Sequence, residues 1–250
     1  MEVNGSKYFE KYKIVPYGFA GILIHYKNLC VQTDEINGKR VLPRSFIAGL
    51  TDLPICIEGT GEIGSIAINL YPIGLYHLLK IPANELVNNT INTDELLDQG
   101  IRKLIEDISR VPDIHTKLQL VNQFLVQVFS EKKLIKNTKI ELAQHELIRS
   151  GGNLNIKSLA KKSGVSVSAL ERNFRTQIGF SPKYYAKIMR FNNVFRLIKS
   201  REKVNWQDII FECGYYDQAH FIREFSTFSG ETPNKFFLKK NLSVKLYSGK

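Results

Sequence analysis

The sequence has little cysteine and lacks any long apolar run. Only Cys30, Cys56 and Cys213 occur in 250 residues, an odd number without a CxxC spacing, which argues against a disulfide framework. Three reduced thiols in a cytoplasmic protein are the simplest interpretation. No stretch reaches the ~20 apolar residues of a membrane span, and the N-terminal MEVNGSKYFEKYK lacks the apolar segment of a secretion signal. We therefore expect a cytoplasmic protein without a membrane partner.

Acidic residues are scarce in only one part of the chain. Residues 1–140 hold 16 basic and 15 acidic side chains, whereas residues 141–250 hold 19 and 9. With 43% hydrophobic residues the chain is expected to fold, so the charge is not that of a disordered polybasic tail. A basic region beside a neutral one predicts a polyanionic partner, nucleic acid before membrane. Charge alone is equally compatible with a merely solvated basic surface.

Residues 14–72 have the pattern of short strands, and the pattern then becomes helical. The candidate strands are rich in Ile and bounded by Gly or Pro, and they lie at 21–26, 45–50, 54–59 and 64–72. The candidate helices lie at 73–80, 94–109 and 114–129. The last two helices carry apolar stripes at 97–108 and 118–128, which either close the β core or form a two-fold interface.

Signals of enzymatic chemistry are weak. The segment GTGEIG at 59–64 precedes no helix, so we interpret it as a hairpin turn rather than a phosphate loop. The available metal ligands, His25, Cys30, Cys56 and His77, show no compact metal-binding spacing. We therefore predict no catalytic residue, no metal site and no cofactor.

A repeat with an offset of about fifty residues organises the C-terminal part. The matched pairs are Asn155 and Asn205, Gly164 and Gly214, Arg172 and Arg223, and Gly179 and Gly230. Each copy begins at an Asn, which is a favoured helix N-cap, and reaches a Gly before the next helix. Helix, short Gly-containing turn and helix is the helix-turn-helix pattern, so we expect two such units.

The second helix of each unit has an inward and an outward face. Apolar residues spaced four and three apart predict the inward faces, which are Leu170, Phe174 and Ile178 in one copy and Phe221, Phe225 and Phe228 in the other. The second helix of such a unit enters the DNA major groove, where Gln can pair with adenine and Arg with guanine. The predicted DNA-binding residues are Ser166, Ser168, Glu171, Arg172, Arg175, Asp217, Gln218, Ala219, His220 and Arg223. The alternative for the arginines and for His220 is a plain solvated surface.

The connector between the units is predicted to be one long helix. Ser181 is a suitable N-cap and Pro182 a suitable first residue, and the helical pattern continues to Ser200. A helix of nineteen residues is ~28 Å long, near the ~34 Å between major-groove faces on one side of DNA. We therefore expect the two second helices to reach adjacent grooves. Lys183, near the start of the connector, is predicted to contact a phosphate.

Residues from about 141 to 240 resemble the DNA-binding domain of the AraC/XylS family of bacterial transcription regulators. The resemblance rests on LAKKSGVSVSALERNF, GFSPKYY and Arg190 in the first unit, and on CGYYDQAHFIREF and SGETPNKFF in the second. Three positions depart from the family pattern: Ile210 replaces a small Ala, Ala219 a common Ser, and Ser226 a common Lys. The resemblance implies a double helix-turn-helix module, and the departures at 219 and 226 predict weaker DNA contact by its second unit.

The N-terminal half resembles, more weakly, the cupin-like domain found ahead of this module in one regulator subgroup. The resemblance rests on SFIAGLTDLP and INLYPIGLYHLLKIPANEL. It implies a domain that senses a ligand or dimerises. The chain begins close to where the first strands of that domain would end, which predicts an incomplete barrel.

We therefore expect an α+β protein of two domains. A β-rich effector or dimerisation domain with C-terminal helices is predicted at 1–138, an all-α double helix-turn-helix domain at 139–242, and a basic tail at 243–250. The expected function is sequence-specific transcription regulation without enzymatic activity. The expected partners are double-stranded DNA, a small-molecule effector of unidentified chemistry, a second copy of the chain, and RNA polymerase. The alternative is a cupin-like enzyme or metal-binding protein that carries a DNA-binding tail, which a stoichiometric metal would indicate.

Overall fold

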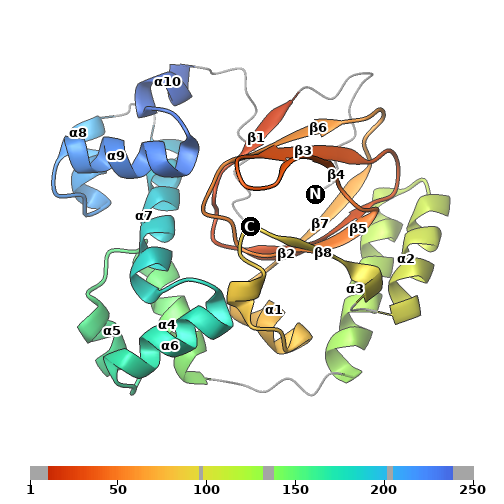
Figure 1. Ribbon diagram of the computed structural model, residues 1–250, viewed down its shortest axis with the longest axis horizontal. Helices are drawn as coiled ribbons and strands as arrows, with labels where there is room; N and C mark the ends of the chain where they lie inside the picture. The colour runs from red at the N-terminus through yellow and green to blue at the C-terminus, as the bar shows by residue number, and fades with distance from the viewer. Residues whose placement is uncertain (1–10, 96–97, 132–137, 202–204, 239–250) are drawn as a thin grey trace.

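A β-rich domain lies beside a helical domain in the computed structural model (Figure 1). The structure describes residues 11–95, 98–131, 138–201 and 205–238. The predicted α+β class is confirmed. No helix in these ranges is long and apolar enough to cross a membrane.

The strands form two four-stranded antiparallel sheets. In one sheet the order is β1 (Tyr12–Ile14), β6 (Ile55–Gly59), β3 (Cys30–Asp34) and β4 (Gly38–Val41). In the other it is β7 (Ser65–Leu70), β2 (Ala20–His25), β5 (Ser45–Ala48) and β8 (Thr90–Asn92). In the centre of the second sheet Ile22 pairs with Ile47 on one side and Ile68 on the other. Cross-strand pairs of β-branched residues of this kind stabilise a sheet.

Four of these strands match the sequence prediction and one predicted turn was wrong. The predicted strands correspond to β2, β5, β6 and β7. The segment at 59–64 is not a hairpin turn, because β6 pairs with β1 and β3 while β7 pairs with β2 in the other sheet. It is a connection that crosses from one sheet to the other.

Three helices follow the strands: α1 (Pro72–Leu79), α2 (Asp98–Arg110) and α3 (Ile114–Glu131). The buried residues Ile101, Leu104 and Ile108 of α2 and Val121 of α3 share one hydrophobic cluster with β2 and β7. The described α2 stripe and Val121 of the α3 stripe therefore close the β core, whereas Leu118 of the α3 stripe is exposed, and a two-fold interface stays a prediction. Leu97, the first residue of the α2 stripe, lies outside the described residues.

The helical domain contains α4 (Thr138–Arg149), α5 (Ile156–Lys162), α6 (Val167–Ile178), α7 (Pro182–Lys199), α8 (Trp206–Glu212), α9 (Gln218–Ser229) and α10 (Pro233–Leu238). Its core is rich in aromatic rings, and Phe174, Tyr185, Phe191 and Phe225 are fully buried. The predicted basic tail at 243–250 lies outside the described residues, and the domain boundary at 138 stays a prediction.

The two domains share one hydrophobic cluster. Val15, Leu50 and Ile73 of the β-rich domain are buried together with the residues that form the core of α4 to α10. Short 3₁₀ helix η1 (Ala83–Glu85) and α1 both contact α6. The β-rich domain is therefore packed directly on the helical one.

Candidate DNA-binding surface

The first helix-turn-helix unit consists of α5 and α6. Asn155 caps α5, its Oδ1 accepting a hydrogen bond from the backbone N–H of Lys157 at 2.8 Å. The turn passes through Gly164, whose φ of 64° is in the left-handed region that favours glycine. Ser166 then caps α6, its Oγ accepting from the N–H of Ala169 at 3.2 Å. The N-caps predicted at residues 155 and 166 are confirmed.

The second unit, α8 and α9, repeats this geometry. The side chain of Asn205 caps α8, and Gly214 in the turn has a φ of 73°. Asp217 caps α9, its Oδ1 accepting from the N–H of His220 at 2.7 Å. The N-cap predicted at residue 217 is confirmed.

The inward and outward faces of the second helices follow the predicted periodicity. The six residues predicted to point inward are all buried: Leu170, Phe174, Ile178, Phe221, Phe225 and Phe228. The predicted DNA-binding residues are exposed, apart from Glu171 and His220, which are half-buried. The two helices therefore present polar faces to solvent while their apolar faces form the core.

Arg172 and Arg223 are exposed at matched positions of α6 and α9. In each helix a threonine four residues later donates its hydroxyl to the arginine carbonyl: Thr176 to Arg172 at 3.2 Å and Thr227 to Arg223 at 2.9 Å. Within the described part of the chain, neither guanidinium has an ion-pair partner. Both side chains are therefore available to an external anion or base.

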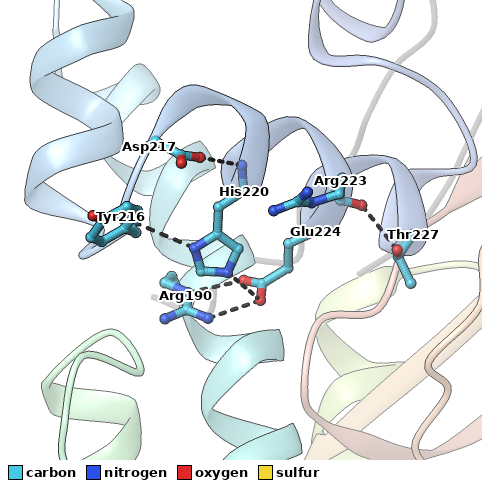
Figure 2. Close-up of polar contacts among 7 residues, drawn as sticks. All are labelled: Arg190, Tyr216, Asp217, His220, Arg223, Glu224 and Thr227. Carbon is cyan, nitrogen blue, oxygen red and sulfur yellow. Dashed lines mark hydrogen bonds and ion pairs between the residues drawn. The ribbon is translucent and has the colours of Figure 1, made fainter.

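His220 is turned toward its own domain. Figure 2 shows its ring between Tyr216 and Glu224. The ring Nδ1 accepts a hydrogen bond from the N–H of Tyr216 at 3.4 Å, and Nε2 lies 3.8 Å from Glu224 Oε2. These contacts favour a role in positioning the start of α9 over direct contact with a base.

Arg190 joins α7 to α9. Its guanidinium donates two hydrogen bonds to the Glu224 carboxylate, at 2.9 Å and 2.8 Å (Figure 2). The side chains are only 16% and 5% exposed, so both charges are largely removed from water. Such a bidentate pair fixes the relative orientation of two elements as well as joining them. Arg190 therefore orients the second unit from within the domain.

Tyr216 is a surface residue that sequence reasoning missed. It precedes the cap residue of α9, and its side chain is 93% exposed. A large exposed aromatic at the start of a second helix is placed where base edges or sugars can be contacted. The signal in the sequence was that Tyr216 is aromatic but lies outside the spacing of the buried phenylalanines of α9.

The connector α7 spans 18 residues, which corresponds to a length of ~27 Å. Ser181 caps it and Pro182 is its first residue, as predicted. Figure 1 shows α6 and α9 at opposite ends of this helix. Beside α7 lies a groove lined in part by basic side chains: Lys157, Lys183, Lys187 and Arg190. Lys183, the residue predicted to contact a phosphate, therefore lies among other basic side chains.

Comparisons with known proteins agree with this geometry. Residues 159–239 match a family model described as a helix-turn-helix domain, and residues 2–92 match a domain of unknown function, DUF6597. An uncharacterized HTH-type transcriptional regulator of Haemophilus influenzae is 24% identical over 173 residues. That match covers 67% of this chain and 55% of the regulator, so it spans about half of the relative's length.

Solved structures of ToxT from Vibrio cholerae share the fold over nearly the whole chain. An apo ToxT variant superimposes with a TM-score of 0.53 at 11% identity, covering 93% of this chain and 96% of ToxT. ToxT bound to (E)-4-(8-methylnaphthalen-1-yl)but-3-enoic acid gives a TM-score of 0.52 at 10% identity, with coverage of 93% and 96%. The helix-turn-helix match, the HTH-type relative and the ToxT fold thus agree with two helix-turn-helix units on one connecting helix beside a β-rich domain, and they support the resemblance of the chain to AraC family transcription regulators.

Proposed function

We propose that the chain reads duplex DNA in a sequence-specific manner, with α6 and α9 in two adjacent major-groove segments. The observation that carries this proposal is the pair of equivalent, exposed and unpaired arginines on second helices at the two ends of one connector. Arginine is the side chain that most often reads guanine in the major groove. The excess of basic residues in the same part of the chain supplies the attraction to phosphates.

Binding of the full chain to random and selected duplexes tests the proposal. After repeated selection from a random pool, the enriched duplex is expected to bind at least ~10³-fold more tightly than random DNA at the same salt concentration. Fluorescence anisotropy of the labelled duplexes measures both affinities. Equal affinity for all sequences would show that only the phosphate backbone is recognised.

We also propose that a small organic acid in the β-rich domain controls this binding. A cavity of about 90 Å³ is lined by residues of both sheets. Most of the lining is apolar, for example Ile14, Leu23 and Phe46. Ligand sites of this kind combine an apolar wall with a few polar groups that orient the ligand.

The polar groups of the cavity include hydrogen-bond donors without a partner. Arg40 Nε and Nη2 are buried and have no hydrogen-bond partner among the described residues. His25 is only 3% exposed, and its Nδ1 is 2.6 Å from Ser65 Oγ while its Nε2 is unpartnered in the described structure. Burial, assisted by the charge of Arg44, lowers the pKa of His25 to about 4, so its ring is neutral at pH 7. Two buried guanidinium nitrogens without a hydrogen-bond partner are costly, and a ligand carboxylate would satisfy them.

An acid as ligand is consistent with the aryl butenoic acid bound by ToxT, which has the same fold. Hexanoate and its uncharged counterpart 1-hexanol are suitable probes in calorimetric titrations of the full chain. We expect hexanoate to bind and Arg40→Met to weaken it at least ~10-fold, whereas the neighbouring exposed Lys39→Met leaves it unchanged. Equal binding of the acid and the alcohol would contradict the proposed role of Arg40.

Binding of a second copy of the chain and of RNA polymerase stays a prediction. The large apolar residues of α3 that remain exposed for a second copy are Leu118 and Val126.

A further inference from the structure

We propose that two short segments of the cavity wall, β1 and residues 51–53, position both DNA-reading helices. The inference deepens the proposed function, because it requires DNA reading by α6 and α9 and gives the route by which the cavity acts on it. In both segments, alternate residues face the cavity and the helical domain. A ligand would therefore lie one thickness of backbone away from the helices that read DNA.

The first segment is β1. Tyr12 and Ile14 line the cavity, whereas Lys13 between them reaches the end of α9. Lys13 Nζ donates to the carbonyl of Ser229 at 3.1 Å and forms an ion pair with Glu231 at 2.9 Å. Because successive side chains of a strand point to opposite faces, movement of the cavity-facing residues must move Lys13 as well.

The second segment is the chain at 51–53. Thr51 and Leu53 line the cavity, and Asp52 between them accepts a hydrogen bond from the Tyr184 hydroxyl at 3.0 Å. Asn88, another lining residue, donates its Nδ2 to Asp52 Oδ1 at 2.8 Å and accepts from the N–H of Asp52 at 3.1 Å. Asn88 has a φ of 57°, an unusual conformation for a residue other than glycine, which these bonds hold in place. The Asp52 carboxylate is therefore fixed by a cavity residue and presented to α7.

Tyr184 contacts both helix-turn-helix units. It lies in the first turn of α7, and its ring centroid is 4.9 Å from that of Phe180, just after α6. On the other side it meets the ring of Phe228, in the buried face of α9, edge-on at 6.0 Å. A shift of Asp52 would therefore act on the packing between the two DNA-reading helices.

Close contacts at two glycines show that the β-rich domain packs tightly against the ends of α9 and α6. A Cβ at Gly230, which ends α9, would lie 3.2 Å from Pro54 Cγ, next to the second wall segment. A Cβ at Gly179, which ends α6, would lie 3.0 Å from Val87 Cγ2 and 3.1 Å from the Ala83 carbonyl. The β-rich domain thus holds the C-terminal ends of both helices. Their N-terminal halves, which carry Arg172 and Arg223, stay exposed.

Thermodynamic coupling between two sites is reciprocal. If the two cavity-wall segments affect DNA binding, DNA binding must in turn change the stability of these segments. We would measure amide hydrogen exchange in the full chain, free and saturated with the duplex that it selects. Peptides covering 11–15 and 51–54 are expected to exchange roughly 5-fold or more slowly in the complex. The variant carrying Lys13→Met and Tyr184→Phe should still bind the duplex but lose this protection. The matched control, Lys39→Met with Tyr76→Phe, removes the same groups elsewhere and should retain it.

Two results would overturn the inference. One is a wild-type complex in which the exchange of peptides 11–15 and 51–54 does not change, and the other is a Lys13→Met, Tyr184→Phe variant that keeps the full protection. A merely structural role would lower the stability of the free variant without removing the effect of DNA. If the double variant does not fold, the same exchange measurement is made on Lys13→Met and Tyr184→Phe separately. A chain that binds no duplex would instead contradict the proposed function, which separates the two failures.

Discussion

At the scale of single residues, the proposed DNA-binding surface and the proposed ligand cavity both contain arginines without a hydrogen-bond or ion-pair partner for their key nitrogens, but these arginines differ in exposure. Arg172 and Arg223 are exposed, so water satisfies their donors until DNA replaces it. Arg40 has two buried nitrogen atoms without a partner among the described residues, so water does not satisfy them. We therefore expect the exposed arginines to select among sequences at little cost to folding, and Arg40 to favour an anionic ligand.

Replacing either exposed arginine should weaken DNA binding. Arg172→Ala and Arg223→Ala are each expected to cost about 1–3 kcal/mol on the selected duplex, because each removes one bidentate base contact. The larger loss is expected at Arg172, since the departures at Ala219 and Ser226 predict weaker DNA contact by the second unit. Anisotropy titrations measure both. Arg149→Ala is the control, because Arg149 of α4 is already paired with Glu146. Unchanged affinity in Arg172→Ala would contradict the assignment of α6.

His25 should make stability depend on pH. Its pKa is about 4 in the folded protein, against 6.5 for an unburied histidine, so the unfolded chain binds the proton first on acidification. The free energy of unfolding should therefore fall between pH 6.5 and 4, by ~3 kcal/mol from this group. Urea unfolding at several pH values measures the slope. His25→Gln should flatten it. Parallel slopes in His25→Gln and wild type would contradict a buried neutral imidazole.

At the scale of elements, α7 is the part on which both helix-turn-helix units depend. Its first turn carries Tyr184, between the two units, and its middle carries Arg190, paired with Glu224 of α9. A connector that packs against both units is stiffer than a flexible linker of the same length. The spacing of α6 and α9 is therefore set by packing as well as by the length of the helix.

Breaking the Arg190–Glu224 pair should destabilise the helical domain. Glu224→Gln leaves a largely buried guanidinium without its counter-charge, and the expected cost is about 3–5 kcal/mol of unfolding free energy. Arg149→Ala removes an exposed cation from Glu146, which keeps Lys162 as a partner, and should therefore cost much less. Chemical denaturation followed by circular dichroism measures both. Equal losses in the two variants would show that the buried pair contributes no more than a surface one.

The helices could be predicted more completely than the strands. Helix 114–129 and the two DNA-reading helices have apolar residues at strong helical spacing, and the structure contains them at nearly the predicted limits. Strands β3 and β4 were missed because CVQTD and GKRV are polar and β4 is at a sheet edge, with three of its four residues exposed. Their formation depends on pairing with distant partners, which local sequence does not encode.

The exposed faces of α6 and α9 could be predicted, but the contacts behind them could not. Periodicity separates Arg172 and Arg223 from the buried phenylalanines in any helix with this sequence. The orientation of His220 depends on Glu224 and Tyr215, and the position of Glu224 depends on Arg190, thirty-four residues away in the chain. The cavity arises from the packing of the two sheets, and the contacts of Lys13 and Asp52 arise from packing between the domains.

At the scale of the whole molecule, the excess of basic charge and the two helices proposed to read DNA lie in one domain, and the cavity lies in the other. Binding should therefore depend steeply on salt, with a log–log slope of roughly −0.9 for each phosphate neutralised. Lys183→Ala is expected to weaken binding to all sequences about equally and to reduce the slope by about one. Titrations at several salt concentrations measure this. A change confined to one sequence would show that Lys183 contacts a base.

Selection of duplexes by the full chain from a random pool, followed by sequencing, tests the central claim most directly. Two clusters of preferred bases are expected about one helical turn, ~10 base pairs, apart, because α6 and α9 lie at the two ends of one connector. Preference in one cluster should be lost in Arg172→Ala and in the other cluster in Arg223→Ala. A single cluster, or the loss of the same cluster in both variants, would contradict the reading of two groove segments by two helices.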